Sequence, residues 1–222
     1  MHEVHVGANL LAENDHAAAH NRQHFIEHGV YVLNLMSAPG AGKTTLLERT
    51  VSALKETYRL AVIEGDVQTN ADAERIERHG VPAVQINTGS ACHLDARMIA
   101  KQLEGDVIDL HALDLLIVEN VGNLVCPAEF DLGEHDKVML LSVTEGDDKP
   151  KKYPLMFHVV KAMVLNKIDL LPHVDFDVDK AEGAARALNL DLEIFRVSAR
   201  SGEGLEGWLG WIESRIERVK GQ

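Results

Sequence analysis

One short segment constrains the fold of this chain more than any other. Residues 37–45 read Ser-Ala-Pro-Gly-Ala-Gly-Lys-Thr-Thr and separate an apolar run at 30–36 from a helix-like stretch that starts at Lys43 and runs to about residue 56. The segment is close to the phosphate-loop pattern G-x-x-x-x-G-K-[ST], with Ser37 in place of the first glycine. A loop of this kind joins a buried strand to the start of a helix, so the segment predicts an α/β fold.

The residue types in this loop suit phosphate binding. Gly40 and Gly42 let the backbone turn its N–H groups toward phosphate oxygens, and the helix N-terminus adds the positive end of its dipole. Lys43 would reach the β and γ phosphates, while the Thr44 hydroxyl would coordinate Mg²⁺. The alternative, a chance glycine-rich turn, is disfavoured by the strand–loop–helix context. The predicted nucleotide-binding residues here are Pro39, Gly40, Ala41, Gly42, Lys43, Thr44 and Thr45.

Strand-like and helix-like segments alternate along the rest of the chain. This alternation predicts a mainly parallel sheet with helices on both faces. We expect an N-terminal helical segment at 1–29, ending at Gly29, and a single P-loop NTPase domain at 30–222, because 222 residues suit one such domain. The strand-like runs that follow the one at 30–36 are 60–64, 83–87, 113–119, 138–143, 161–166 and 193–197.

The overall composition excludes several classes of protein. Acidic side chains outnumber basic ones by 35 to 22, and the net charge of −13 would repel nucleic-acid phosphates. No apolar run approaches the length needed to cross a bilayer, and the N-terminus lacks the pattern of a secretory leader. We therefore expect a cytoplasmic protein without nucleic-acid or membrane partners, in which the two cysteines stay reduced.

A second motif indicates which base the nucleotide carries. Asn166-Lys-Ile-Asp169 ends a predicted strand and matches N-K-x-D, the guanine-reading motif of GTPases. Asp169 can accept hydrogen bonds from both the ring N–H and the exocyclic amino group of guanine, a pair that adenine does not offer. Lys167 would lie along the base, Asn166 would tie this loop to the phosphate side, and Ser198-Ala199 would offer a backbone N–H to the guanine oxygen. The motif therefore predicts GTP.

Carboxylates at the ends of predicted strands are candidates for a Mg²⁺ site. Asp66 follows the second predicted strand, and Glu119 closes the fourth and begins Glu-Asn-Val-Gly122. This segment is an E-x-x-G form of the D-x-x-G switch motif, whose glycine N–H would contact the γ-phosphate. We predict that Thr44, Asp66 and Glu119 hold Mg²⁺, and that Lys43, Asp66 and Glu119 are catalytic. The alternative role for Asp66 is to cap the helix that follows it.

Cysteine and histidine side chains suggest a second kind of metal site. Cys92 and His93 are adjacent just after a predicted strand, and Cys126 follows Glu119 on the next such loop. Thiolate and imidazole are ligands that select Ni²⁺ or Zn²⁺ over Mg²⁺. Three ligands leave a tetrahedral ion one short, so water or a second chain across a two-fold axis would complete the site. The alternative is a pair of buried cysteines beside a capping histidine.

Histidine also recurs along the N-terminal helix. His16, His20, His24 and His28 are spaced by four residues and would line one helix face. Histidine pairs at this spacing can chelate a metal ion. The interpretation that the sequence favours is a surface helix with incidental histidines, because no motif couples this face to the nucleotide.

Together these motifs resemble the HypB family of hydrogenase-maturation GTPases, within the SIMIBI type of P-loop GTPases that includes signal-recognition and metallocentre-assembly proteins. The resemblance covers residues 30–219, and its most specific parts are Thr88-Gly-Ser-Ala-Cys-His-Leu-Asp-Ala96 and Glu119-Asn-Val-Gly-Asn-Leu-Val-Cys-Pro127. It implies GTP hydrolysis, a GTP-dependent homodimer and delivery of nickel into [NiFe]-hydrogenase. It also implies that Cys92, His93 and Cys126 bind Ni²⁺ or Zn²⁺ near the dimer interface.

The resemblance further implies particular partners, namely the hydrogenase large subunit or another nickel-insertion accessory protein. Some family members carry an N-terminal cysteine-rich nickel motif and others a long histidine-rich stretch, and this sequence shows neither. We therefore do not expect high-affinity nickel storage at the N-terminus. The similar urease accessory GTPases carry a Cys-Pro-His triplet instead of the arrangement seen here, and they are the nearest alternative.

Two other functions are compatible with parts of the pattern. A small-molecule kinase with a structural zinc would need an acceptor pocket and would not need guanine selectivity, whereas a GTP-gated adaptor would use the cysteines only for structure. No residue stands out as a catalytic base. Our hypotheses are that Asp66 positions the attacking water and that Lys149, in Glu145-Gly-Asp-Asp-Lys-Pro150, contacts nucleotide across a dimer.

Overall fold

The computed structural model of the chain describes residues 6–66, 71–89, 91–105 and 107–221 and is built around one seven-stranded sheet. The strand order is β3-β2-β4-β1-β5-β6-β7, and every neighbouring pair runs in parallel. The expectation of a mainly parallel α/β sheet is thus confirmed. The strands are β1 (Tyr31–Ser37), β2 (Leu60–Asp66), β3 (Ala83–Asn87), β4 (Leu115–Glu119), β5 (Asp136–Ser142), β6 (Ala162–Asn166) and β7 (Glu193–Arg196).

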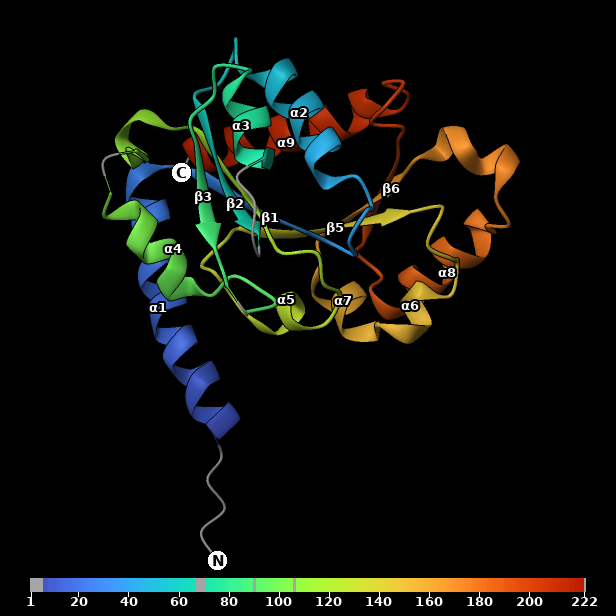
Figure 1. Cartoon of the computed structure of the whole chain (residues 1–222), viewed down its shortest axis with the longest axis horizontal. Coiled ribbons are helices and arrows are strands. Elements are labelled where there is room, and N and C mark those ends of the chain that lie inside the picture. Colours follow the sequence, from blue (N-terminus) through green and yellow to red (C-terminus); the bar gives the residue numbers. More distant parts are fainter. Residues whose placement is uncertain (1–5, 67–70, 90, 106, 222) are drawn as a thin grey trace, which may run out of the picture.

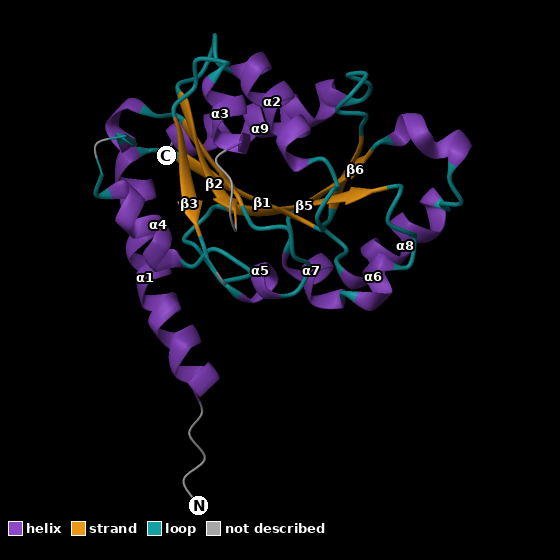
Figure 2. Cartoon of the chain, viewed as in Figure 1, coloured by secondary structure: helices purple, strands orange, loops and turns teal. Residues whose placement is uncertain are grey.

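Helices cover both faces of this sheet, as Figures 1 and 2 show. One face carries α2 (Lys43–Leu54), α3 (Ala71–Glu77) and α9 (Leu205–Lys220). The opposite face carries α1 (Val6–His28), α4 (Ala96–Leu103), α5 (Cys126–Glu129), α6 (Lys149–Lys152), α7 (Pro154–Val159) and α8 (Val178–Leu188). Two short 3₁₀ helices complete the described elements, η1 (Leu110–Ala112) and η2 (Ile168–His173). None of the described helices is long and apolar enough to span a membrane.

The strands at the centre of the sheet are mostly apolar in sequence because helices bury them on both sides. Every residue of β1 and β4 is buried, which is the pattern expected of a parallel sheet with covered faces. On the α2–α9 face the core includes the indole of Trp208, whose Nε1–H donates to Thr50 Oγ1 at 2.9 Å. The buried polar atom of this large side chain thus has a hydrogen-bond partner inside the core.

Helix α1 is fastened to the domain by buried asparagines. Asn21 Nδ2 donates to Ala96 O at 2.8 Å and to Leu132 O at 3.0 Å, while Asn14 Oδ1 accepts from Ala96 N at 2.9 Å. The helix ends at His28, and Gly29 follows with φ 63°. The predicted helix end at this glycine is confirmed, because only glycine adopts that left-handed conformation without strain.

Several element boundaries differ from the sequence expectations. The strand expected at 113–119 starts two residues later, because η1 comes first and the Asp114 carboxylate turns to Arg59, accepting from its backbone N at 2.8 Å. Strand β5 starts before the expected position, at Asp136, and α2 ends at Leu54 instead of near residue 56. Asp66 closes β2, and the described part of α3 begins at Ala71. The alternative role of Asp66 as a cap of that helix concerns residues 67–70, which lie outside the described residues.

Candidate functional site

The phosphate loop lies at the point where the strand order reverses, between β1 and α2. In parallel α/β sheets this position is the usual ligand crevice. Gly40 and Gly42 have φ of 76° and 100°, and Lys43 Nζ donates to Ser37 Oγ at 3.0 Å. A cavity of about 420 Å³ opens above the loop and is lined by Pro39, Gly40, Gly42, Lys43, Thr44, Thr45, Glu64, Gly65, Asp66, Asp72, Arg75, Glu119, Asn120, Val121 and Gly122.

Two glutamates from neighbouring strands meet in this cavity. Glu64 of β2 and Glu119 of β4 are aligned in the strand register. Thr44 Oγ1 donates to Glu119 Oε1 at 3.4 Å, and Lys43 Nζ lies 3.9 Å from the same oxygen. Glu119 Oε2 and Glu64 Oε1 are buried, and neither has a hydrogen-bond partner among the described residues. These oxygens are therefore acceptors available to a cation or a donor.

Burial also changes the protonation of this pair. Desolvation raises the pKa of Glu64 well above its ordinary range, and the neighbouring Glu119 raises it further. Desolvation raises the pKa of Glu119 too, although Lys43 opposes that shift. Two buried carboxyls this close favour a shared proton, and a bound cation would favour their ionised forms.

The oxygen atoms around the cavity fit a magnesium ion. Magnesium prefers hard oxygen ligands, and Thr44, Asp66 and Glu119 supply a hydroxyl and two carboxylates on the phosphate side of the loop. The orphaned Glu119 oxygen gives this set a buried anionic ligand. The structure thus brings the three predicted Mg²⁺ ligands to one cavity, together with Lys43 and Gly122.

The predicted base-reading residues lie on the other side of the phosphate loop and are tied to it. Asn166 Nδ2 donates to Ala41 O at 2.9 Å, and Lys167 Nζ donates to Gly40 O at 2.7 Å. A Cβ on Gly42 would come within 2.7 Å of Asn166 Nδ2, so a side chain at residue 42 would separate the two loops. The expected link from Asn166 to the phosphate side is present.

Asp169 and the Ser198-Ala199 segment complete this second loop cluster. Asp169 Oδ1 is buried and accepts no hydrogen bond from any described residue. The Ala199 N–H donates to Asn166 Oδ1 at 3.0 Å, so it is already used within the protein. Ser198 is buried and its Oγ accepts from Ser201 N at 3.1 Å. A backbone N–H offered to a guanine oxygen would therefore come from elsewhere on the Ser198 loop.

The three predicted soft-metal ligands converge. Cys92 Sγ lies 2.9 Å from Cys126 Sγ and 3.7 Å from His93 Nδ1, and one ligand atom of each residue lies within 4.8 Å of the others. Two thiolates on one tetrahedral ion would lie about 3.8 Å apart at the usual zinc–sulfur bond length, so the sulfurs need to separate by only about 1 Å. Cys92 is exposed, which leaves room for a fourth ligand from solvent or from a second chain.

The surroundings of the cluster favour the metal-binding form of His93 but the protonated form of Cys126. Burial lowers the pKa of His93, whose ring packs against Phe130 with the ring centroids 3.9 Å apart, so the imidazole is neutral near pH 7. The hydrogen bond with Cys92 and then burial raise the pKa of the Cys126 thiol, so metal binding would displace a proton from it.

A single loop joins this cluster to the nucleotide cavity. Residues 119–126 begin at Glu119 in the cavity and end at Cys126. Along the way Gly122 packs on Pro39, where an added Cβ would meet backbone atoms at 3.1 Å, and Asn123 Nδ2 donates to Cys92 O at 3.2 Å. A displacement of the phosphate loop would therefore be transmitted through Gly122 to Cys126, and through Asn123 to Cys92.

Some cavity residues were not predicted from the sequence. Glu64 is a buried acid that follows four apolar residues in β2, and this change from apolar to acidic was the available signal. Asp72 and Arg75 come from α3 and form an ion pair of 3.3 Å, and no local pattern marked them. Lys149 does not line this cavity; its Nζ lies 3.7 Å from Glu145 Oε2.

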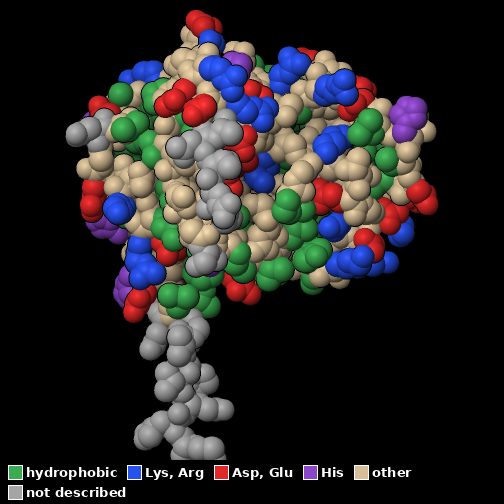
Figure 3. Space-filling model, viewed as in Figure 1, with side chains coloured by type: hydrophobic (Ala, Val, Ile, Leu, Met, Phe, Trp, Pro, Cys, Tyr) green, Lys and Arg blue, Asp and Glu red, His purple; other side chains and the backbone are tan. Residues whose placement is uncertain are grey.

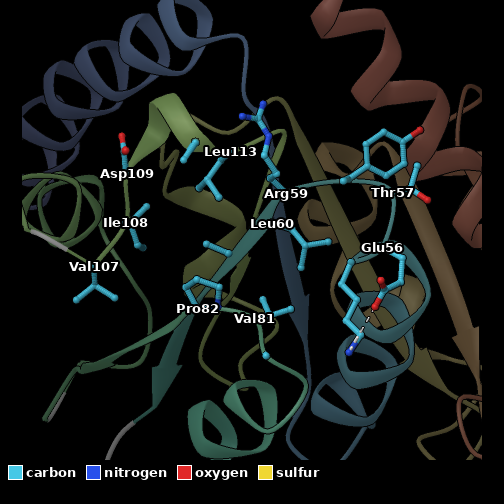
Figure 4. Close-up of a pocket in the computed structure, with 15 residues that line it drawn as sticks. Glu56, Thr57, Arg59, Leu60, Val81, Pro82, Val107, Ile108, Asp109 and Leu113 are labelled. Carbon is cyan, nitrogen blue, oxygen red and sulfur yellow. Dashed lines mark ion pairs between the residues drawn. The ribbon is translucent and has the colours of Figure 1, made fainter.

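A second cavity, of about 360 Å³, lies at the opposite edge of the sheet. Figure 4 shows its lining, from Glu56 and Arg59 to Pro82 and Leu113. It surrounds the start of β2 and contains none of the predicted site residues. Ligands of parallel sheets gather at the carboxyl ends of the strands, so the phosphate-loop cavity is the candidate site.

Comparison with known proteins agrees with this geometry. Residues 31–196 match the nucleotide-binding domain of the CobW/HypB/UreG family. The chain is 57% identical to the hydrogenase maturation factor HypB of Azotobacter chroococcum over 99% of its own length and 74% of that protein. The crystal structure of HypB from Archaeoglobus fulgidus superposes with a TM-score of 0.86 at 40% identity, covering 92% of this chain and 99% of the other. HypB from Helicobacter pylori, solved in complex with nickel, gives the same TM-score at 41% identity, covering 93% and 96%.

Proposed function

Because this chain belongs to the HypB hydrogenase maturation factors of the CobW/HypB/UreG family, we propose that it is a GTP-hydrolysing metallochaperone that delivers nickel for [NiFe]-hydrogenase. The observation that carries the proposal is the loop at 119–126, which lines the nucleotide cavity at one end and supplies a sulfur ligand at the other. The Helicobacter pylori relative, a HypB solved with nickel, supports the choice of cargo. The cytosol is the proposed compartment, where the cysteines stay reduced.

The nucleotide part of the proposal assigns a role to each loop. Lys43 and the backbone N–H groups of residues 39–45 hold the phosphates, and Asp169 selects guanine through its unpartnered buried oxygen. Thr44, Asp66 and Glu119 hold Mg²⁺, which when bound neutralises negative charge that develops on the phosphate oxygens. Lys43 is placed to act on the same charge, because its ammonium lies between Ser37 and Glu119.

The coupling part of the proposal follows from the γ-phosphate contact. When GTP is present, the Gly122 N–H contacts the γ-phosphate and holds the loop at 119–126 against Pro39. Cys126 is then fixed beside His93 and the exposed Cys92, and this partly exposed cluster faces a second copy of the chain in a GTP-dependent homodimer. Loss of the γ-phosphate releases Gly122, loosens Cys126 and lowers the affinity for the metal, so the ion passes to the hydrogenase large subunit or to another nickel-insertion protein.

Metal titration in defined nucleotide states tests this function. The full chain is titrated with Ni²⁺ and with Zn²⁺ in the presence of a non-hydrolysable GTP analogue, of GDP or of no nucleotide, while molecular mass is recorded. We expect metal affinity to differ between the GTP-analogue and GDP states by about 5- to 150-fold, the range typical of coupled sites. We also expect the dimer only with the GTP analogue.

Cysteine variants assign that binding to the proposed ligands. Cys92→Ala and Cys126→Ala should each remove the nucleotide-dependent ion, whereas His173→Ala, at an exposed histidine outside the metal cluster, should not. Identical binding in all nucleotide states and in both cysteine variants would contradict the proposal. It would leave a guanine-nucleotide-binding protein with structural cysteines.

A further inference from the structure

Four histidines from two separate elements meet at the outer side of α1. His20, His24 and His28 lie on one face of that helix, and His111 comes from η1, more than eighty residues away in the sequence. The ring centroids of His20 and His24 are 4.5 Å apart, and those of His28 and His111 are 4.3 Å apart. Figure 3 shows histidine side chains on the surface along the edge that α1 and α4 form. The four-residue spacing predicted that the histidines of α1 share one face, but it did not predict the contact between His28 and His111.

The nitrogen atoms of two of these histidines already have the spacing of metal ligands. His20 Nε2 and His24 Nε2 are 3.3 Å apart. Two imidazole nitrogens on one tetrahedral ion would lie about 3.3 to 3.4 Å apart, given the usual metal–nitrogen bond length. In the absence of an ion, one of these nitrogens carries the proton that lies between them. A cation would displace that proton and take both lone pairs.

A third imidazole is oriented so that its outer nitrogen is a free acceptor. His28 Nδ1 lies 2.7 Å from the backbone oxygen of His24. A carbonyl oxygen only accepts, so Nδ1 carries the proton and Nε2 keeps its lone pair. Metal-binding histidines commonly have this arrangement, in which a backbone carbonyl fixes the tautomer of the ring.

The cavity beside these rings is suited to a cation. It measures about 460 Å³, and Glu104 and Asp109 stand with the four imidazoles among its lining residues. No lysine or arginine lines it among the residues that the structure describes. Arg59 and Lys220 belong to the neighbouring cavity, which His28 and His111 also border. The groups that face the first cavity are thus neutral or negative.

The helix that carries the histidines is held in place independently of them. Asn21, Ala18 and Phe25 are buried on the inner face of α1, and the Asn21 amide bonds fix the helix to the start of α4. The histidine face is therefore presented by a rigid element, which preserves ligand geometry better than a loop would.

We propose that His20 and His24 form a second site for a borderline divalent cation such as Ni²⁺ or Zn²⁺, with water completing its coordination. His28 or His111 would join the pair only after its ring reorients, because no third histidine, cysteine or carboxylate atom of the described residues lies within 4.8 Å of both. Imidazole suits these ions, whereas Mg²⁺ and Ca²⁺ prefer oxygen ligands. The site is separate from the cysteine cluster, because Cys92, His93 and Cys126 do not line the cavity beside His20 and His24.

The test measures ion stoichiometry on the full, untagged chain in a Cys92→Ala/Cys126→Ala background, so that the cysteine cluster contributes nothing. We expect this background variant to retain about one Ni²⁺ or Zn²⁺ per chain, and the addition of His20→Gln/His24→Gln to remove it. A Co²⁺ complex of the background variant should show no near-ultraviolet thiolate band. Circular dichroism on each variant verifies that α1 is still folded.

Two control variants distinguish metal binding at this site from nonspecific metal binding by other histidines. His16→Gln changes the histidine one turn earlier on the same helix, which does not line the cavity, and should keep the ion. His2→Gln/His5→Gln, outside the described residues, should also keep it. The proposal is overturned if the cysteine-free background binds no ion, or if either control loses as much binding as His20→Gln/His24→Gln. Nucleotide-dependent binding at the cysteine cluster should be unchanged by His20→Gln/His24→Gln, so the two metal proposals can fail separately.

Discussion

Asp169 carries the choice of base in the proposed GTPase. Its buried Oδ1 accepts no hydrogen bond from the described residues, and a guanine would supply the missing donors. Asp169→Ala should therefore weaken GTP binding by about 1.5 to 3 kcal/mol, or roughly 10- to 150-fold, the usual contribution of hydrogen bonds to a charged group. Isothermal titration of wild type and variant gives this difference directly.

Inosine triphosphate sharpens that measurement, because inosine lacks the exocyclic amino group of guanine. Wild type should prefer GTP over ITP, and Asp169→Ala should bind both alike, since a site that pairs with a group discriminates against its absence. Asp175→Ala, at an exposed acid a few residues along, is the matched control and should keep the preference. An unchanged GTP-to-ITP ratio in Asp169→Ala would exclude this residue as the guanine reader.

Single residues also mark how far the sequence could predict the site. The phosphate loop, Asp169 and the Cys92-His93 pair were found because each belongs to a local motif with fixed spacing. Glu64 was missed because an isolated acid in a strand has no motif, and only the register that aligns it with Glu119 places it in the cavity. His111 was missed for a related reason, since a tertiary contact across distant segments leaves no local pattern.

The proposed coupling between nucleotide and metal depends on the loop at 119–126. Gly122 touches the backbone of Pro39 so closely that an added methyl group would displace one of the two loops by a few tenths of an ångström. Gly122→Ala should therefore bring the ratio of metal affinities between the GTP-analogue and GDP states close to one. The measurement is metal titration in the two nucleotide states.

A glycine elsewhere provides the control for that substitution. Gly210 lies in α9, and an added Cβ there meets nothing within 4 Å. Gly210→Ala should retain the full ratio between nucleotide states. If Gly122→Ala retains it as well, the loop does not transmit the state of the nucleotide.

At the scale of elements, apolar runs in the sequence predicted all seven described strands, whereas a polar anchor decided where β4 begins. Strand β4 starts at Leu115 because Asp114 is held by Arg59 and, at 3.2 Å, by Lys220 Nζ of α9. Those partners come from the start of β2 and the end of the chain. Because neither partner lies within residues 113–119, that segment alone could not predict where β4 begins.

The same carboxylate links distant parts of the whole molecule and should affect its global stability. Arg59 holds the pKa of Asp114 well below its usual range. Asp114→Asn should lower the free energy of unfolding by about 1 to 3 kcal/mol at pH 7, because it leaves charged hydrogen bonds unmade. Urea denaturation measures the loss, with the exposed Asp191→Asn as the control.

The pH dependence of that loss has a definite sign. A carboxyl whose pKa is lower in the folded state stabilises the fold above its unfolded pKa of about 3.9, and this contribution is lost as the pH falls toward the folded value. The difference between wild type and Asp114→Asn should therefore be constant from pH 5 to pH 7 and shrink below about pH 4. A difference that persists unchanged into acid would show that the ion pair does not cause it.

The strand order has a further consequence for how the chain is made. Strand β1, which leads into the phosphate loop, pairs with β4 on one side and β5 on the other, so its second edge stays open until residue 142 has been synthesised. Before residue 119, β2 and β3 are the only adjacent described strands available, and the apolar β1 has no partner in the nascent chain. The sheet around the nucleotide site is therefore completed late in synthesis. Until then, an incomplete chain exposes the apolar central strands of the sheet and does not yet bind phosphate.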